Sequence, residues 1–131
     1  MMDFDSLYEA AKAALLPRIL TDHAECGMVA AALLADSGKV YTGVNIDTHC
    51  GLGFCAEHAA AAAMLAAGDN RVLKMVAVNK SGEIMPPCGR CRELISQLHD
   101  ENLHCEVLVA KGRVMRLADL LPMDWKDGWK A

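Results

Sequence analysis

Three cysteines and one glutamate stand at spacings that suit a catalytic metal centre. Cys55 lies two residues before Glu57, and Cys88 and Cys91 form a Cys-x-x-Cys pair directly behind Pro87. A hydrolytic zinc site needs three protein ligands, an open fourth position for water, and a proton carrier that is not itself a ligand. The cysteines are therefore the candidate ligands for one Zn²⁺ per chain, and Glu57 is the candidate catalytic group.

The same order of residues is the signature of zinc deaminases, in which a ligand-x-Glu precedes Pro-Cys-x-x-Cys. In that chemistry Glu57 would take a proton from the zinc-activated water that attacks C4 of a cytosine ring. It would pass the proton to N3 and later help protonate the departing amine, so that ammonia leaves. An ordinary first-turn glutamate, favoured there by the helix dipole, is the alternative, but it leaves the downstream cysteines unexplained.

A Cys-x-x-Cys pair alone also serves redox dithiols and structural zinc sites. The redox interpretation leaves Cys55 and Glu57 without a role, and the two prolines before Cys88 do not suit it. A structural zinc would need a fourth ligand, for which Cys50, His49 and His58 are available.

The cysteines fall in the predicted first turns of two helices, where unpaired N–H groups and the positive end of the dipole favour thiolates. Three thiolates on Zn²⁺ still sum to one negative charge, so a positive group should offset them. Arg90 and Arg92 are the candidate donors to the sulfurs. Alternatively, Arg92 is a solvent-exposed residue of the helix that does not contact the sulfurs.

Composition points to one intracellular domain over residues 1–131. Hydrophobic residues make up 53% of the 131 and charged residues 23%, which argues against disorder. The net charge of −4 offers no basic surface, so no nucleic-acid partner is expected. No apolar run of about 18 residues predicts a membrane span, and the acidic start is unlike a secretory signal. Six cysteines in a reducing, cytoplasmic setting favour metal binding over disulfides.

Helical and strand-like segments alternate along the chain. We expect an amphipathic helix over 4–16, a loop over 18–27, a hairpin over 28–46, helices over 55–67 and 88–99, buried strands over 72–79 and 105–110, a short strand over 114–116 and a helical turn over 118–121. This order predicts an α/β fold of three layers, α-β-α, whose sheet mixes an antiparallel hairpin with parallel neighbours. The helix over 55–67 carries no charge after His58, which predicts burial against the sheet and against another element or subunit.

Several segments, in the right order, resemble blocks of the cytidine deaminase family in its small three-cysteine form. They are Val29-Ala-Ala-Ala-Leu33, Gly43-Val-Asn-Ile46, Cys55-Ala-Glu57, Pro87-Cys-Gly-Arg-Cys-Arg92 and Leu120-Leu-Pro122. Thr42 to Asn45, the short loop before Cys55 and the Pro-Cys-Gly-Arg-Cys-Arg run are particularly similar to the blasticidin S deaminases, relatives that act on a cytosine nucleoside antibiotic.

The resemblance implies a cytidine-deaminase-like fold with a mixed five-stranded sheet, and a homotetramer whose active sites borrow residues from neighbouring subunits. It also implies that Asn45 binds the sugar and that the backbone N–H of Ala56 binds the pyrimidine. Trp125 would cover a neighbour's site with its ring; a surface aromatic in the tail is the alternative.

Three positions depart from the family pattern. Asp47 stands where a glutamate usually binds the ribose hydroxyl, and it is one methylene shorter. His58 stands where arginine usually follows the catalytic glutamate, which would shift charge compensation to Arg90. The aromatic residue expected near Gly27 is absent.

Taken together, the sequence predicts zinc-dependent hydrolytic deamination of a free cytosine nucleoside, cytidine or deoxycytidine. The alternatives are a blasticidin S-type deaminase, a zinc-stabilised binding or scaffold protein without turnover and, more distantly, a redox dithiol protein.

Overall fold

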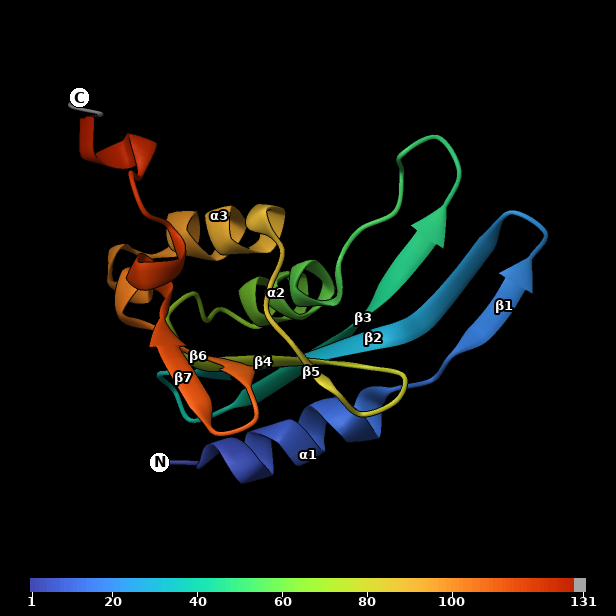
Figure 1. The fold of residues 1–131 in the computed structure, drawn as a ribbon, viewed down its shortest axis with the longest axis horizontal. Helices are drawn as coiled ribbons and strands as arrows, with labels where there is room; N and C mark the ends of the chain where they lie inside the picture. The colour runs from blue at the N-terminus through green and yellow to red at the C-terminus, as the bar shows by residue number, and fades with distance from the viewer. Residues whose placement is uncertain (129–131) are drawn as a thin grey trace.

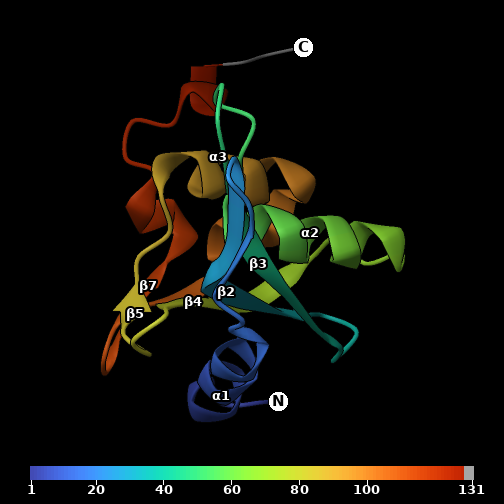
Figure 2. The same cartoon turned by 90° about the vertical axis from the view of Figure 1, so that its right-hand side faces the viewer.

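A computed structural model describes residues 1–128, so the last three residues of the predicted domain lie outside it. Within the described residues, one mixed sheet carries a helix on one face and two on the other (Figures 1 and 2). The helices are α1 (Phe4–Ala14), α2 (Ala56–Ala66) and α3 (Gly89–Leu98). The strands are β1 (Arg18–Thr21), β2 (Ala24–Ala35), β3 (Val40–Thr48), β4 (Val72–Asn79), β5 (Ile84–Met85), β6 (Glu106–Ala110) and β7 (Arg113–Arg116). The predicted three-layer α/β fold with a mixed sheet is confirmed.

The sheet of the described chain has seven strands, where the resemblance implied five. Its central pair is β2 and β4, which run antiparallel, and β4 pairs parallel with β6. The two strands that the sequence did not indicate are β1 and β5. β5 is only two residues long, and every residue of β1 is exposed, so neither shows the alternation of buried and exposed residues that marks a strand.

The predicted loop over 18–27 is wrong, because most of this segment forms the β1–β2 hairpin. β1 pairs with the first residues of β2, so the hairpin extends beyond the body of the sheet (Figure 1). A bulge follows in β2 between Cys26 and Ala30, opposite β3. Gly27 permits it with φ of 78°, and a Cβ there would lie 2.0 Å from the Leu16 carbonyl oxygen.

Helix α1 covers one face of the sheet. The Asp3 carboxylate caps it by accepting a hydrogen bond of 2.9 Å from the Ser6 backbone N–H, and Pro17 follows shortly after its end. Leu7 and Ala11 are buried in a core with Ala30, Ala32 and other sheet residues. The amphipathic helix expected over 4–16 is thus confirmed, ending two residues early.

Helices α2 and α3 lie on the opposite face and carry the predicted ligands. Helix α2 lies very close to β3, since a Cβ on Gly43 would sit 2.4 Å from the Ala60 backbone nitrogen. Its inner face is buried, whereas Leu65 on its outer face is 44% exposed. Within the described residues, no helix has the length and apolar character needed to cross a membrane.

Candidate active site

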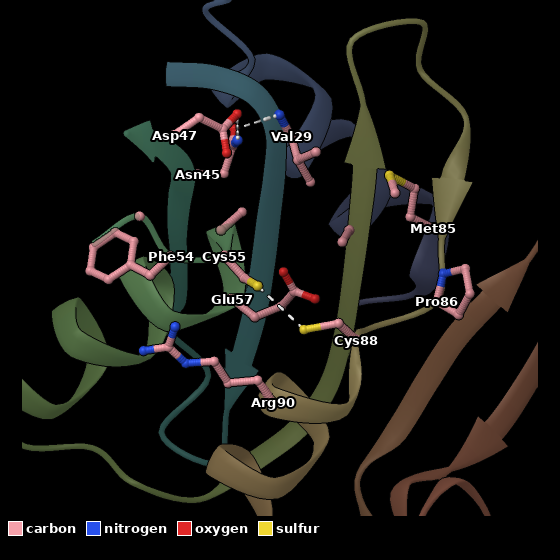
Figure 3. A pocket seen from close by; sticks show the side chains of 13 residues that line it. Val29, Asn45, Asp47, Phe54, Cys55, Glu57, Met85, Pro86, Cys88 and Arg90 are labelled. Carbon is pink, nitrogen blue, oxygen red and sulfur yellow. Dashed lines mark hydrogen bonds between the residues drawn. The ribbon is translucent and has the colours of Figure 1, made fainter. Parts of the chain in front are cut away.

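The three predicted zinc ligands meet at the starts of two helices. Cys55 is the N-cap residue of α2, Cys88 is the N-cap residue of α3, and Cys91 lies in the first turn of α3. The Cys88 Sγ atom lies 3.3 Å from Cys55 Sγ (Figure 3). It lies 3.4 Å from Cys91 Sγ. Tetrahedral sulfurs at about 2.3 Å from zinc lie about 3.8 Å apart, so the cluster fits one zinc ion after shifts of a few tenths of an ångström.

A fourth donor, His58, adjoins this cluster. Its Nδ1 lies 3.5 Å from Cys91 Sγ. The donor atoms of Cys55, His58 and Cys91 all lie within 4.8 Å of one another, a grouping that could hold a metal ion. The sequence offered His58 only as a fourth ligand of a structural zinc or as a substitute for arginine. Its contact with Cys91 depends on how α2 and α3 pack, which no spacing in the chain reveals.

Glu57 lies beside the sulfurs and faces the same cavity (Figure 3). It is only 4% exposed, and burial raises the pKa of its carboxyl above the ordinary value. A raised pKa suits a group that must both accept and release a proton near neutral pH. Glu57 therefore lies beside the sulfurs and faces the cavity, and its role as proton carrier stays a prediction.

The surroundings of the sulfurs differ from one another. Burial and the hydrogen bond with Cys88 raise the pKa of Cys55, and burial with the nearby Glu57 carboxylate raises that of Cys91. Burial opposes ionisation of Cys88 too, but backbone N–H groups of Cys91 and Arg90 and the neighbouring thiols outweigh it and lower its pKa. A divalent cation would remove these protons by supplying the positive charge that the cluster lacks.

The cavity in front of the cluster has a volume of about 330 Å³. Asn45, Asp47 and Ala56, for which the sequence predicts substrate contacts, line it. The Asn45 side chain accepts a hydrogen bond from the Val29 backbone N–H at 2.9 Å and donates one to Asp47 at 3.0 Å. Ala56 is the first residue of α2, so its N–H has no partner within the helix.

Apolar walls of the cavity were not foreseen. They comprise Phe54, Val29, Met85 and Pro86. Phe54 is placed by paired backbone hydrogen bonds of 3.0 Å with Ile46, and it supplies an aromatic ring although none lies near Gly27. Its position directly before Cys55 was a usable signal, as were those of Met85 and Pro86 just before Cys88, whereas Val29 comes from a strand far away in the sequence.

The two arginines lie differently from the expectation. Arg90 lines the cavity with its guanidinium turned to the Phe54 side, and within residues 1–128 no hydrogen bond joins that group to a sulfur (Figure 3). Arg92 donates to the carbonyl oxygens of Pro87 at 2.7 Å and Leu120 at 3.2 Å. Arg92 therefore anchors the turn before Cys88.

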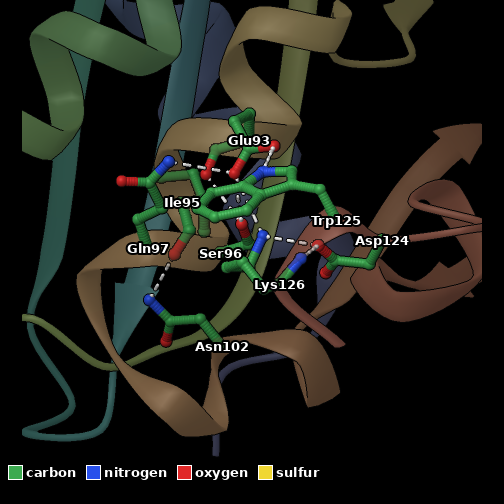
Figure 4. A network of polar contacts seen from close by, with 8 residues as sticks. All are labelled: Glu93, Ile95, Ser96, Gln97, Asn102, Asp124, Trp125 and Lys126. Atoms are coloured by element: carbon green, nitrogen blue, oxygen red, sulfur yellow. Dashed lines mark hydrogen bonds and ion pairs between the residues drawn. The ribbon is translucent and has the colours of Figure 1, made fainter. Parts of the chain in front are cut away.

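Trp125 lies apart from the cavity of its own chain, on a helical turn that packs against α3 (Figure 4). Its Nε1 donates a hydrogen bond of 2.8 Å to Glu93, which also accepts one from Lys126 at 3.0 Å. The side chain is still 53% exposed.

Comparison with known proteins agrees with this geometry. Residues 7–107 match the family described as the cytidine and deoxycytidylate deaminase zinc-binding region. A cytidine deaminase of Mycobacterium tuberculosis (strain ATCC 25618 / H37Rv) is 39% identical over 95 residues, which is 72% of this chain and 69% of that protein. A cytidine deaminase of Halalkalibacterium halodurans is 32% identical over 97 residues, 72% of this chain and 74% of that protein.

Solved structures give the same result over more of the chain. The crystal structure of cytidine deaminase from Mycobacterium tuberculosis superposes with a TM-score of 0.80 at 31% identity, covering 95% of this chain and 98% of that one. The enzyme from Mycobacterium leprae gives 0.79 at 29% identity, covering 94% of this chain and 100% of that one. The likeness therefore includes the helices and strands that carry the candidate site.

Proposed function

We propose that this protein, which belongs to the cytidine and deoxycytidylate deaminase family, deaminates a free cytosine nucleoside, cytidine or deoxycytidine, with one zinc ion per chain. Uridine or deoxyuridine and ammonia are the products. The observation that carries the proposal is the meeting of Cys55, Cys88 and the buried Glu57 at one cavity, with Cys91 behind them. We assign the three cysteines as the ligands.

Zinc bound to these cysteines would supply a water acidic enough to give up a proton. Glu57 accepts that proton, delivers it to N3 of the ring, and then helps protonate the leaving amine. The burial that raises the pKa of Glu57 fits it to both directions of transfer. Phe54 and Val29 form apolar walls that exclude bulk water from the ring.

We assign the backbone N–H of Ala56 to the pyrimidine, and Asn45 with Asp47 to the sugar. The Val29 N–H fixes the Asn45 amide so that its nitrogen faces Asp47, which sets both groups at one wall of the cavity. We assign Arg90 as the cation that offsets the cluster's charge through space, and Arg92 as the support of the Cys88 turn.

The particular similarity to blasticidin S deaminases remains part of this proposal. The shorter Asp47 leaves more room beside the sugar position than a glutamate would. A larger cytosine nucleoside analogue, or blasticidin S itself, is therefore a second candidate substrate.

We further propose a homotetramer with shared active sites. The outer face of α2 exposes only apolar residues, among them Ala62, Ala63 and Leu65, and such a face is suited to a subunit contact. The exposed ring of Trp125 could reach a neighbour's cavity in such an assembly. Light scattering on the purified protein measures the mass directly, and a monomer would exclude shared sites.

We also propose a single domain over 1–131, a cytoplasmic location and no nucleic-acid partner. All six cysteines are free, as expected in a reducing compartment, and the net charge is −4.

The test follows the ultraviolet absorption of cytidine, deoxycytidine and blasticidin S, each incubated with zinc-loaded protein, with Glu57→Gln as the control. Conversion that is lost in the variant supports the deaminase and identifies its sugar preference. No conversion of any of the three by protein holding one zinc per chain would favour the scaffold alternative.

A further inference from the structure

His58 contacts the cluster of Cys55, Cys88 and Cys91 but has no part in the proposed proton transfers. It follows Glu57 on α2, yet it does not line the cavity, which is formed by Cys55, Glu57 and Cys88. Its ring lies beside Phe54, with centroids 6.3 Å apart, and its Nδ1 lies 3.5 Å from Cys91 Sγ.

We propose that His58 is a positioning residue whose Nδ1–H donates a hydrogen bond to the Cys91 thiolate, and that His58 does not itself bind zinc. This inference rests on the proposed function, because it assumes that the three cysteines hold the metal. It assigns His58 the task of stabilising the negative charge that three thiolates leave on a zinc centre.

Cys91 is the sulfur that most needs such a donor. It has no exposed surface, whereas Cys88 is exposed and Cys55 is partly so. Cys88 also receives backbone N–H groups of the first turn of α3. Besides the thiols of the other two ligands and the Glu57 carboxyl, whose own task is the proton transfer, the Cys91 sulfur has the His58 Nδ1 atom within hydrogen-bonding distance. A buried thiolate without a donor would be costly, so the contact supports metal binding.

The alternative is a closed site in which His58 replaces water or replaces Cys88. The grouping of Cys55, His58 and Cys91 allows that reading. However, it would leave the Cys88 sulfur, 3.3 and 3.4 Å from the other two, outside the metal shell or would close the position that water needs.

Two substitutions separate these possibilities. His58→Asn keeps an N–H donor near the place of Nδ1, and His58→Leu removes it. Zinc affinity is measured by competition with a coloured chelator, and zinc X-ray absorption counts sulfur ligands and detects imidazole. Circular dichroism of the metal-free proteins confirms that all three fold.

We expect His58→Leu to weaken zinc binding by about 10- to 100-fold, with His58→Asn close to wild type. We also expect three sulfurs and no imidazole in the absorption of all three proteins. An imidazole signal in wild type that disappears in His58→Leu, or equal zinc affinity in all three, would overturn the proposal. A three-sulfur wild type without turnover would instead overturn the proposed function and leave the affinity comparison to decide the role of His58.

Discussion

At its first turn, α3 brings the thiols of Cys88 and Cys91 within 3.4 Å of one another, next to the buried carboxyl of Glu57. At its other end, the same helix is held by Asn102, a fully buried side chain that uses its oxygen and both amide hydrogens. Its oxygen accepts from the Val72 N–H at 2.8 Å, and its nitrogen donates to the carbonyls of Asn70 at 3.1 Å and Ile95 at 2.9 Å.

The two ends differ in how well their buried polar groups are hydrogen-bonded. The ligand end holds groups that are poorly satisfied until a cation and a substrate arrive, and such groups cost stability. Asn102 holds that end of α3, and Glu93 in the middle of the helix bonds the C-terminal turn, so that the ligand end keeps its geometry (Figure 4). Substitutions at the two ends should therefore affect activity and stability in opposite proportions.

The largest expected effect is on activity, at Glu57. Replacing it with Gln removes the proton carrier while keeping the shape of the side chain, so we expect the turnover rate to fall by about 10²- to 10⁴-fold. The free energy of unfolding should stay level or rise, because the buried group no longer has a charged form. Stopped-flow or steady-state assays and urea unfolding measure the two quantities. If Glu57→Gln lost stability in proportion to its loss of activity, the proposed difference between the two ends would be wrong.

Asn102 should show the reverse pattern. Asn102→Ala leaves a buried N–H and two carbonyls unpaired, at about 1 to 3 kcal/mol for each group that water cannot reach, so we expect a total loss of at least about 3 kcal/mol. Asn70→Ala is the matched control, since its side chain is exposed and donates one hydrogen bond, to the Leu98 carbonyl. Well below the unfolding transition, the turnover rate of Asn102→Ala should remain near wild type. A large drop in turnover with little loss of stability would show that the ligand end does not keep its geometry independently.

The sequence predicted the ligand end better than the supporting end. Cys55, Glu57, Cys88 and Cys91 could be recognised because metal chemistry restricts both residue type and spacing, and because helix starts have their own signals. Asn102 carries no such signal: a buried asparagine and a solvated one look the same until the loops around it are placed. The contacts of Arg92 with backbone carbonyls likewise depend on tertiary structure.

Strand prediction failed where burial was absent. The segment Arg18–Thr21 pairs with β2 through its backbone while all its side chains are exposed, so hydrophobic periodicity gives no indication of it. By contrast, Val72–Asn79 is buried along most of its length and was predicted at its observed bounds.

A third test addresses how closely α2 must lie to the sheet in order to deliver Cys55 and Glu57. Gly43→Ala places a methyl group 2.4 Å from the Ala60 backbone nitrogen, so α2 must move. We expect a loss of about 1 to 3 kcal/mol in the free energy of unfolding, with weaker zinc binding. Gly89→Ala, whose Cβ would enter open space, is the control for stability. If Gly43→Ala changed neither the free energy of unfolding nor zinc binding, α2 would tolerate displacement from the sheet.

The smallest expected effect concerns Glu93, in the middle of α3. Hydrogen bonds from Gln97, Lys126 and Trp125 lower the pKa of its carboxyl to about 2. Because the folded pKa lies below the ordinary value of 4.5, this stabilisation is fully present above pH 4.5 and disappears as the pH falls toward 2.

Unfolding of wild type and Glu93→Gln should therefore differ at pH 6, and the two should converge as the pH is lowered through this window. Measuring both proteins without metal keeps thiolate protonation from contributing to the difference, and Asp127→Asn, on the same C-terminal turn, serves as the control. If the gap between wild type and Glu93→Gln were constant from pH 6 to about 3, the Glu93 carboxylate would not be stabilised by its partners, and the support of α3 would rest on Asn102.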